Sequence, residues 1–176
     1  MPCEELDEKS AYDEVEIIQG SVTARCYGLF WGHLESGHNP IGWDTSKYET
    51  EPAAQEISVL LLERLGDPLS RDMLGHPFPS EIIDEWEELL DDFNELNIFY
   101  RDLHRRNILR APRSPPGLPT RECPVHRKQH AWRIIDLGCK REKNWLTTDA
   151  RRVYHRQILR DVKQRWEMGD DSPLSN

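Results

Sequence analysis

The most informative part of the chain is the sequence YRDLHRRNIL (residues 100–109), followed by RIIDLG (residues 133–138). It places Asp102 and Asn107 on one loop and Asp136 at the end of a short apolar run. Phosphoryl transfer from a nucleotide needs one carboxylate near the attacking hydroxyl, and an amide and a second carboxylate on magnesium. The two segments contain residues of each of these types.

The two segments resemble the catalytic loop and the metal-binding loop of the protein-kinase-like superfamily. The Asp-Leu-His-x-x-Asn form is most similar to small-molecule phosphotransferases of the aminoglycoside and choline type and to fungal kinase-like proteins. The surrounding order agrees with this resemblance, because a long apolar-striped helix precedes the loop and an Ile-Ile-Asp-x-Gly strand end follows it. The alternative is a coincidental set of polar turns between helices.

The resemblance implies a role for each matching residue. Asp102 would accept or orient the attacking hydroxyl of the substrate. Asn107 and Asp136 would bind Mg²⁺ bridging the ATP phosphates, since hard cations prefer such oxygen ligands. His104 matches the small-molecule-kinase form, with packing and backbone hydrogen bonding as its structural alternative. Gly138 would let the metal loop turn sharply.

Weaker resemblance extends upstream. Glu8 stands where the family places the Glu that pairs with its phosphate-binding Lys, although an exposed helical Glu is the plain alternative. Residues 62–66 are similar to the passage into the hinge, so the backbone of Glu63 and Leu65 is expected to bind the adenine edge. Tyr100 stands where the family usually has His, which leaves the anchoring hydrogen bond of the loop in question.

The sequence also departs from the family. No glycine-rich loop precedes the first predicted helix, and no lysine precedes Lys9. After residues 136–138 the chain enters its last predicted helix within about ten residues, without a long activation segment. We therefore expect an incomplete N-lobe, real or left by an incomplete gene model, and weak or absent activity. The alternative function is a non-catalytic pseudokinase or interaction module.

Hydrophobic periodicity predicts an α+β fold. Residues 1–65 are expected to form a partial N-lobe and residues 66–167 a reduced, mainly helical C-lobe. Strand 57–63 is expected to be central, and Ser80 to be the N-cap of helix 80–97, whose eight acids form a solvated face. The other expected segments are helix 4–18, strand 24–31, a flexible insertion at 112–130, helix 146–167 and a disordered tail at 168–176.

Charge and cysteine usage narrow the class of partner. Residues 1–100 carry 5 basic and 23 acidic side chains, a balance of −18, and residues 101–176 carry 18 and 9, a balance of +9. Attraction between the halves is the plain explanation, and a basic floor for nucleotide phosphates is the alternative. The cysteines are irregularly spaced and no apolar run is long enough to cross a membrane, so we expect a soluble cytoplasmic protein. We expect it to bind a nucleotide and a hydroxyl-bearing substrate, either a small molecule or a protein. We expect no membrane partner and no specific nucleic acid.

One rival constellation is Cys123-x-x-His126-x-x-x-His130. This spacing suits three zinc ligands, and Cys139 or Asp136 could complete a tetrahedral set. The plain alternative is a basic, disordered extension of a hairpin.

Overall fold

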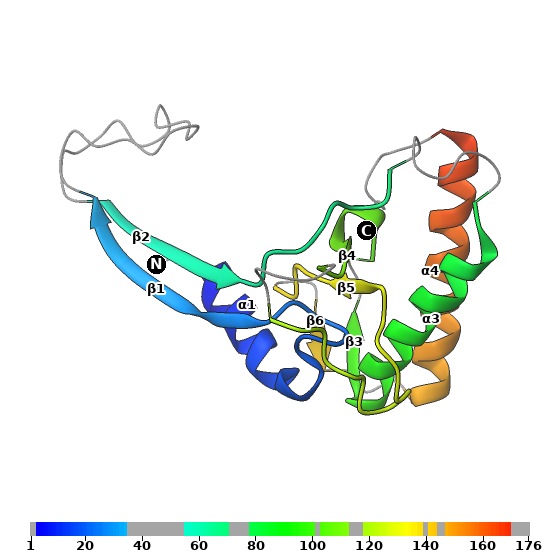
Figure 1. The fold of residues 1–176 in the computed structure, drawn as a ribbon, viewed down its shortest axis with the longest axis horizontal. Coiled ribbons are helices and arrows are strands. Elements are labelled where there is room, and N and C mark those ends of the chain that lie inside the picture. The colour runs from blue at the N-terminus through cyan, green and yellow to red at the C-terminus, as the bar shows by residue number, and fades with distance from the viewer. Residues whose placement is uncertain are drawn as a thin grey trace.

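The computed structural model describes residues 3–34, 55–70, 78–100, 103–112, 118–138, 141–143 and 147–169. These residues form an α+β fold of helices and short antiparallel strand pairs (Figure 1). The elements are α1 (Cys3–Glu14), η1 (Glu16–Ile18), β1 (Cys26–Leu34), β2 (Gln55–Leu62), α3 (Ser80–Glu95), β3 (Ile98–Tyr100), η3 (Arg105–Asn107), β4 (Ile108–Arg110), β5 (Trp132–Ile134), β6 (Arg141–Lys143) and α4 (Thr148–Met168).

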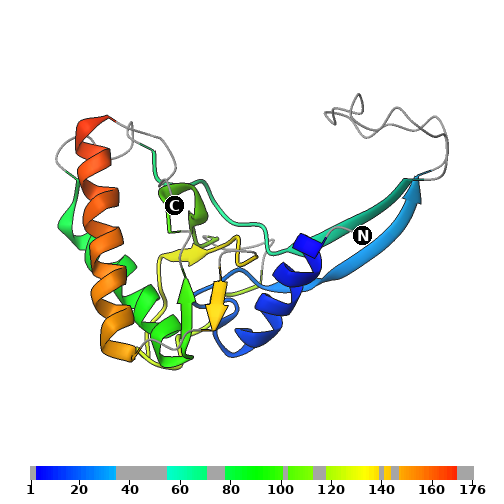
Figure 2. The ribbon, with the colours of Figure 1, turned by 180° about the vertical axis from the view of Figure 1, so that it is seen from behind.

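The β1 and β2 strands form a long antiparallel ribbon that extends away from the rest of the molecule, with α1 beside its base (Figures 1 and 2). Phe30 pairs with Val59 across the ribbon, and both side chains are at least half exposed. The expectation of a central β2 is therefore wrong for the described residues. An apolar run predicts burial, but it does not specify which neighbours will cover the strand.

The main core lies where α3 and α4 pack side by side against the short strand pairs (Figure 2). The stripe of α3 buries Trp86, Leu89 and Phe93 as its period predicts. Phe78 joins the two helices, with its ring centroid 5.7 Å from that of Trp86 and 5.1 Å from that of Trp166. Both pairs are edge-to-face, the arrangement that aromatic quadrupoles favour.

The chain after β2 runs onto the β4–β5 hairpin. Gly66 N–H donates to the carbonyl of Arg110 at 2.9 Å, and Pro68 forms an isolated bridge with Leu109. On the other side of the hairpin, Ile134 N–H donates to the carbonyl of Val22 at 2.8 Å. These bonds connect the ribbon and α1 to the strand that precedes Asp136.

Ion pairs join the acidic α3 to the basic part of the chain. Arg152 on α4 contacts Asp91 at 3.0 Å and Glu95 at 2.9 Å, and Arg156 pairs with Glu87. The acids of α3 therefore do not form a simple solvated face as expected. Attraction between the acidic and basic halves explains these contacts.

Two element boundaries differ from the sequence expectation. Pro79, rather than Ser80, is the N-cap of α3, and its side chain makes no capping hydrogen bond. Helix α4 has Thr147 as its N-cap, accepting from Ala150 N–H at 3.3 Å, and ends at Gly169 with φ 84°. Glycine adopts this left-handed C-terminal conformation without steric cost.

Residues 118–130 are not the flexible insertion that their composition predicts. Cys123 and His130 are buried there, and Arg25 reaches the segment from the start of the ribbon, donating to Pro119 O at 2.5 Å. Residues 113–117 and 170–176, parts of the expected insertion and tail, lie outside the described residues. Among the described residues, no helix has the combination of length and apolar character that crossing a bilayer requires.

Candidate functional site

The structure brings Asn107 and Asp136 together. Asn107 ends η3 and Asp136 follows β5, and pairing of Ile108 with Ile134 sets the two residues side by side. Ile135 N–H donates to the carbonyl of Asn107 at 2.9 Å, and Asn107 Nδ2 donates to Asp136 Oδ2 at 3.4 Å. One hairpin thus presents an amide and a carboxylate from opposite strands.

Tyr100 holds this pair from behind. Its hydroxyl donates to the carbonyl of Ile135 at 2.9 Å and accepts from Asn107 Nδ2 at 3.2 Å. The ring is buried and stacks on Phe93 of α3, with centroids 5.7 Å apart. Tyr100 therefore anchors the loop through hydrogen bonds, at the position where kinase-like proteins usually have His.

Asp136 has an uncommon backbone conformation. Its φ is 60°, in the left-handed region that Asp and Asn tolerate better than most non-glycine residues. Backbone strain of this kind concentrates at functional sites. Gly138 lies two residues later, at a partly buried bend. The residue of this loop with a positive φ is therefore Asp136 and not Gly138.

The remaining part of the expected catalytic loop is only partly described. Asp102 lies outside the described residues. Leu103 is fully buried and fixes the start of the described loop in the core. His104 is half-buried and precedes η3, where its carbonyl accepts from Asn107 N–H at 2.9 Å. His104 thus belongs to the turn that positions Asn107.

Helix α1 borders the Asp136 loop. Burial raises the pKa of Tyr12 strongly, and the negative charges of Glu8 and Asp136 are among the groups that reinforce the shift. Glu8 and Asp136 are far apart in the sequence, yet both charges affect the pKa of the same buried Tyr12 hydroxyl. Lys9, the neighbour of Glu8, pairs with Asp13 at 2.6 Å on the surface of α1.

The predicted hinge residues follow the ribbon. Glu63 N–H donates to the carbonyl of Arg25 at 2.8 Å, and the Glu63 carboxylate is buried and accepts from Arg25 Nη1 at 2.5 Å. Leu65 packs partly buried against the core. An open hollow of about 500 Å³ lies nearby, between α3 and the β4–β5 hairpin, with Arg110 and Trp132 in its lining. Neither Asn107 nor Asp136 lines this hollow.

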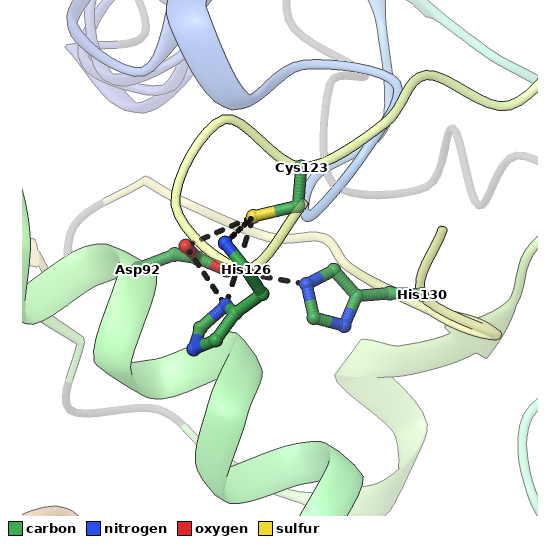
Figure 3. Close-up of side chains that lie close together, drawn as sticks. All are labelled: Asp92, Cys123, His126 and His130. Carbon is green, nitrogen blue, oxygen red and sulfur yellow. Dashed lines mark hydrogen bonds and ion pairs between the residues drawn. The ribbon is translucent and has the colours of Figure 1, made fainter. Parts of the chain in front are cut away.

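A second cluster lies where residues 123–130 meet α3. Asp92, Cys123, His126 and His130 place one potential ligand atom each within 4.8 Å of one another (Figure 3). Asp92, Cys123 and His130 are buried and His126 is partly exposed. Burial raises the pKa of the Cys123 thiol, and the backbone N–H of His126 opposes that shift by donating to the sulfur.

The sequence identified three of these four residues but not Asp92; of the two residues predicted as the fourth ligand, one lies elsewhere and the other is not described. Asp136 contacts Asn107 instead, and Cys139 lies outside the described residues. The actual fourth member, Asp92, was assigned to a solvated face. It lies three residues after Leu89 and four before Leu96, on the apolar side of α3, and that position was the signal that could have identified it.

No protein-family model, curated protein or solved structure matches the chain.

Proposed function

We propose that the chain is a protein-kinase-like phosphotransferase domain that binds ATP with magnesium and transfers the γ-phosphate to a hydroxyl group. The observation that carries the proposal is the 3.4 Å contact between Asn107 Nδ2 and Asp136 Oδ2. This contact joins the two residues that the family motif assigns to the metal.

Magnesium would be held by the Asp136 carboxylate and the Asn107 amide oxygen. Phosphate oxygens and water would complete its shell, as is usual for this cation. The bound metal neutralises charge that develops on the phosphates during transfer. Asp102 is assigned to the attacking hydroxyl on the family resemblance alone.

In this proposal the β1–β2 ribbon and α1 are a reduced N-lobe. Helices α3 and α4, with the short strand pairs, are the C-lobe. The adenine would lie against the backbone at Glu63 and Leu65, where the ribbon passes into the C-lobe. The backbone hydrogen bond from Gly66 N–H to the carbonyl of Arg110 would then hold this hinge against β4, the strand that follows Asn107.

A non-catalytic module is the second candidate function. The ion pair between Lys9 and Asp13 favours it, because this lysine is engaged on the α1 surface. Loss of a single preorganised electrostatic donor costs about 3–4 kcal/mol of barrier, or roughly 100- to 1000-fold in rate. Such a domain would bind magnesium–ATP and turn over slowly or not at all.

Thermal unfolding with and without nucleotide tests the binding step. We expect Mg–ATP at about 100 times its Kd to stabilise the wild-type chain by about 2.7 kcal/mol, while Asp136→Asn shows a much smaller shift. Magnesium should be omitted in the reference sample instead of being chelated, because a chelator would also remove a metal from the second cluster. Millimolar Mg–ATP with no shift in melting temperature would overturn the proposal.

Transfer is tested separately with radiolabelled ATP and a panel of aminoglycosides, amino alcohols and serine-containing peptides. We expect labelled product with the wild-type chain and loss of it in Asp102→Asn, which should still bind nucleotide. Equal labelling by both proteins would identify a contaminating kinase. A nucleotide-dependent stabilisation without any transfer would select the non-catalytic function.

A further inference from the structure

We propose that Asp92, Cys123, His126 and His130 form a structural zinc site that fastens residues 118–130 to α3. The proposal does not depend on nucleotide binding, because it uses none of the residues assigned to the nucleotide. Two imidazoles, a thiol and a carboxylate are a ligand set that zinc uses in proteins. Soft sulfur and imidazole donors argue against magnesium or calcium at this position.

Four separations between potential ligand atoms are close to those of tetrahedral coordination, and one ligand atom from each residue lies within 4.8 Å of the others. Zinc bonds of about 2.0–2.3 Å at tetrahedral angles place neighbouring ligand atoms roughly 3.3–3.6 Å apart. Asp92 Oδ1 lies 3.1 Å from Cys123 Sγ and 3.4 Å from His126 Nδ1, and Sγ lies 3.7 Å from His126 Nδ1. His130 Nε2 lies 3.4 Å from Asp92 Oδ2. Only small movements would bring all four donors onto one ion.

The backbone of the loop is folded around the sulfur. His126 N–H donates to Cys123 Sγ at 3.4 Å, and Cys123 N–H donates to the carbonyl of Lys128 at 2.8 Å. Arg127 N–H donates to the carbonyl of Cys123 at 3.0 Å, and Arg127 itself has φ 54°. An Arg in the left-handed region is uncommon. The tight turn it permits directs the Cys123 and His126 side chains to the same point (Figure 3).

Three buried polar atoms in the cluster make no hydrogen bond within the described chain, although two of them, Asp92 Oδ2 and His130 Nε2, lie 3.4 Å from each other. Asp92 Oδ2 and both ring nitrogens of His130 make no hydrogen bond to the part of the chain that the structure describes. Each buried polar atom without a hydrogen bond costs roughly 1–3 kcal/mol, so native proteins rarely keep several together. A zinc ion bound to His130 Nε2 and to Asp92 would satisfy two of the three atoms.

The third atom lies near a carboxylate, the kind of group that often stands beside a metal-binding histidine, and this carboxylate also pairs with Lys128. His130 Nδ1 lies 3.9 Å from Glu88 Oε2, one turn before Asp92 on α3. A carboxylate near the second ring nitrogen orients a zinc-bound imidazole and increases its basicity. With four protein donors and little exposure, the site has the closed character of structural zinc.

The zinc site also explains how a Pro- and Arg-rich segment packs. Residues 118–130 contribute few large apolar side chains, and two of them, Leu118 and Val125, are exposed. Metal bonds from one segment to a helix can replace the missing hydrophobic burial. We therefore expect removal of zinc to loosen this segment first and to lower the stability of the whole domain.

Metal analysis of the untagged full-length chain tests the proposal. We expect about one zinc ion per chain in protein expressed with zinc. Zinc affinity should fall more than about a hundredfold in Cys123→Ser and His130→Gln, since even outer partners of a metal site change affinity 10- to 100-fold. Matched controls are Cys26→Ser, the other cysteine described as free, and His155→Gln, another buried histidine. Both controls should keep their zinc.

Cobalt replacement of the metal keeps the test decisive if a variant fails to fold. Cobalt-loaded wild-type protein should show the intense visible bands of a tetrahedral ion and a thiolate-to-cobalt charge-transfer band. The charge-transfer band should be lost in Cys123→Ser and kept in Cys26→Ser. Wild-type protein that binds neither zinc nor cobalt at micromolar concentration would overturn the proposal, as would an octahedral cobalt spectrum. If neither metal binds, the cluster is a metal-free network in which the Cys123 thiol donates to Asp92.

Discussion

Cys123 Sγ lies 3.1 Å from Asp92 Oδ1, and both side chains are fully buried. The contact joins the loop before β5 to the middle of α3 across 31 positions of sequence. A neighbouring side of α3 is joined to α4 through Arg152, which contacts Asp91. Neighbouring acids on one helix therefore hold two different parts of the chain, one through a buried cluster and the other through surface ion pairs.

The first prediction concerns the buried Arg151 of α4. Its Nη2 donates to Asn97 Oδ1 at 2.8 Å, to the carbonyl of Asn94 at 3.2 Å and to Thr148 Oγ1 at 3.1 Å. Arg151→Met removes these bonds and leaves the carbonyl of Asn94 buried without this donor. We expect the free energy of unfolding in urea to fall by about 3 kcal/mol.

Arg152→Gln is the control for that experiment, because the two residues are adjacent and Arg152 is partly exposed. Its pairs with Asp91 and Glu95 are surface ion pairs, which contribute less than about 1 kcal/mol each. We expect a loss well below that of Arg151→Met. Equal losses in the two variants would contradict the assignment of Arg151 as the main polar connection between α4 and α3.

The second prediction concerns the pH dependence caused by His155. Burial lowers the pKa of this imidazole to about 4, and its ring stacks on Phe99 with centroids 5.5 Å apart. In the unfolded chain the pKa is about 6.5. The unfolded state therefore binds the proton more readily, so stability is fully present above about pH 6.5 and is lost as the pH falls toward 4. The total change is about 3 kcal/mol.

Urea unfolding between pH 4 and pH 7 measures this effect by difference. His155→Gln should have a shallower loss of stability with acid than the wild-type chain. His33→Gln, at the exposed end of β1, should follow the wild-type slope. An unchanged slope in His155→Gln would show that other groups cause the acid sensitivity.

The third prediction concerns Tyr100→Phe. This change removes the hydroxyl that bonds both Ile135 O and Asn107 Nδ2. We expect the free energy of unfolding to fall by about 1–2 kcal/mol and the Mg–ATP stabilisation to weaken, because Asn107 loses an anchor. Zinc content should not change. Tyr154→Phe, at a partly exposed ring, should change stability by less than about 0.5 kcal/mol; a similar loss there would contradict the prediction.

The apolar residues of α4 predicted its position and the C-terminal half of its buried face, from Ile158 to Trp166, but not the N-terminal half. Residues 150, 154, 158, 162 and 166 recur at a spacing of four, which rotates by about 40° at each step around a helix of 3.6 residues per turn. Tyr154 is therefore partly exposed, and Val153 is 66% exposed. The buried stripe includes Arg151 and His155 instead. Polar side chains concealed this stripe, because their burial depends on partners from α3 and β3.

The two candidate sites differ in how far sequence could specify them. The resemblance to kinase-like loops implied that Asn107 and Asp136 meet, and the pairing of Ile108 with Ile134 brings them together. Asp92 could not be matched to Cys123 in the same way, since nothing local determines which face of α3 the loop will cover. Composition also predicted a flexible loop. Composition records apolar content, whereas this segment is held by a buried thiol and by Arg25.

The fourth prediction separates backbone strain from charge at Asp136. With φ at 60°, Asp136→Gly should raise the free energy of unfolding by up to about 1 kcal/mol, and Asp136→Ala should lower it by about as much. Asp136→Asn should leave it within about 0.5 kcal/mol, because Asn tolerates the left-handed region as Asp does. All three variants should lose the Mg–ATP stabilisation, since each removes the carboxylate. Urea and thermal unfolding measure the two effects separately. If Asp136→Gly and Asp136→Ala change the free energy of unfolding in the same direction, the backbone at Asp136 is not strained. If Asp136→Gly is still stabilised by Mg–ATP, the carboxylate does not hold the metal.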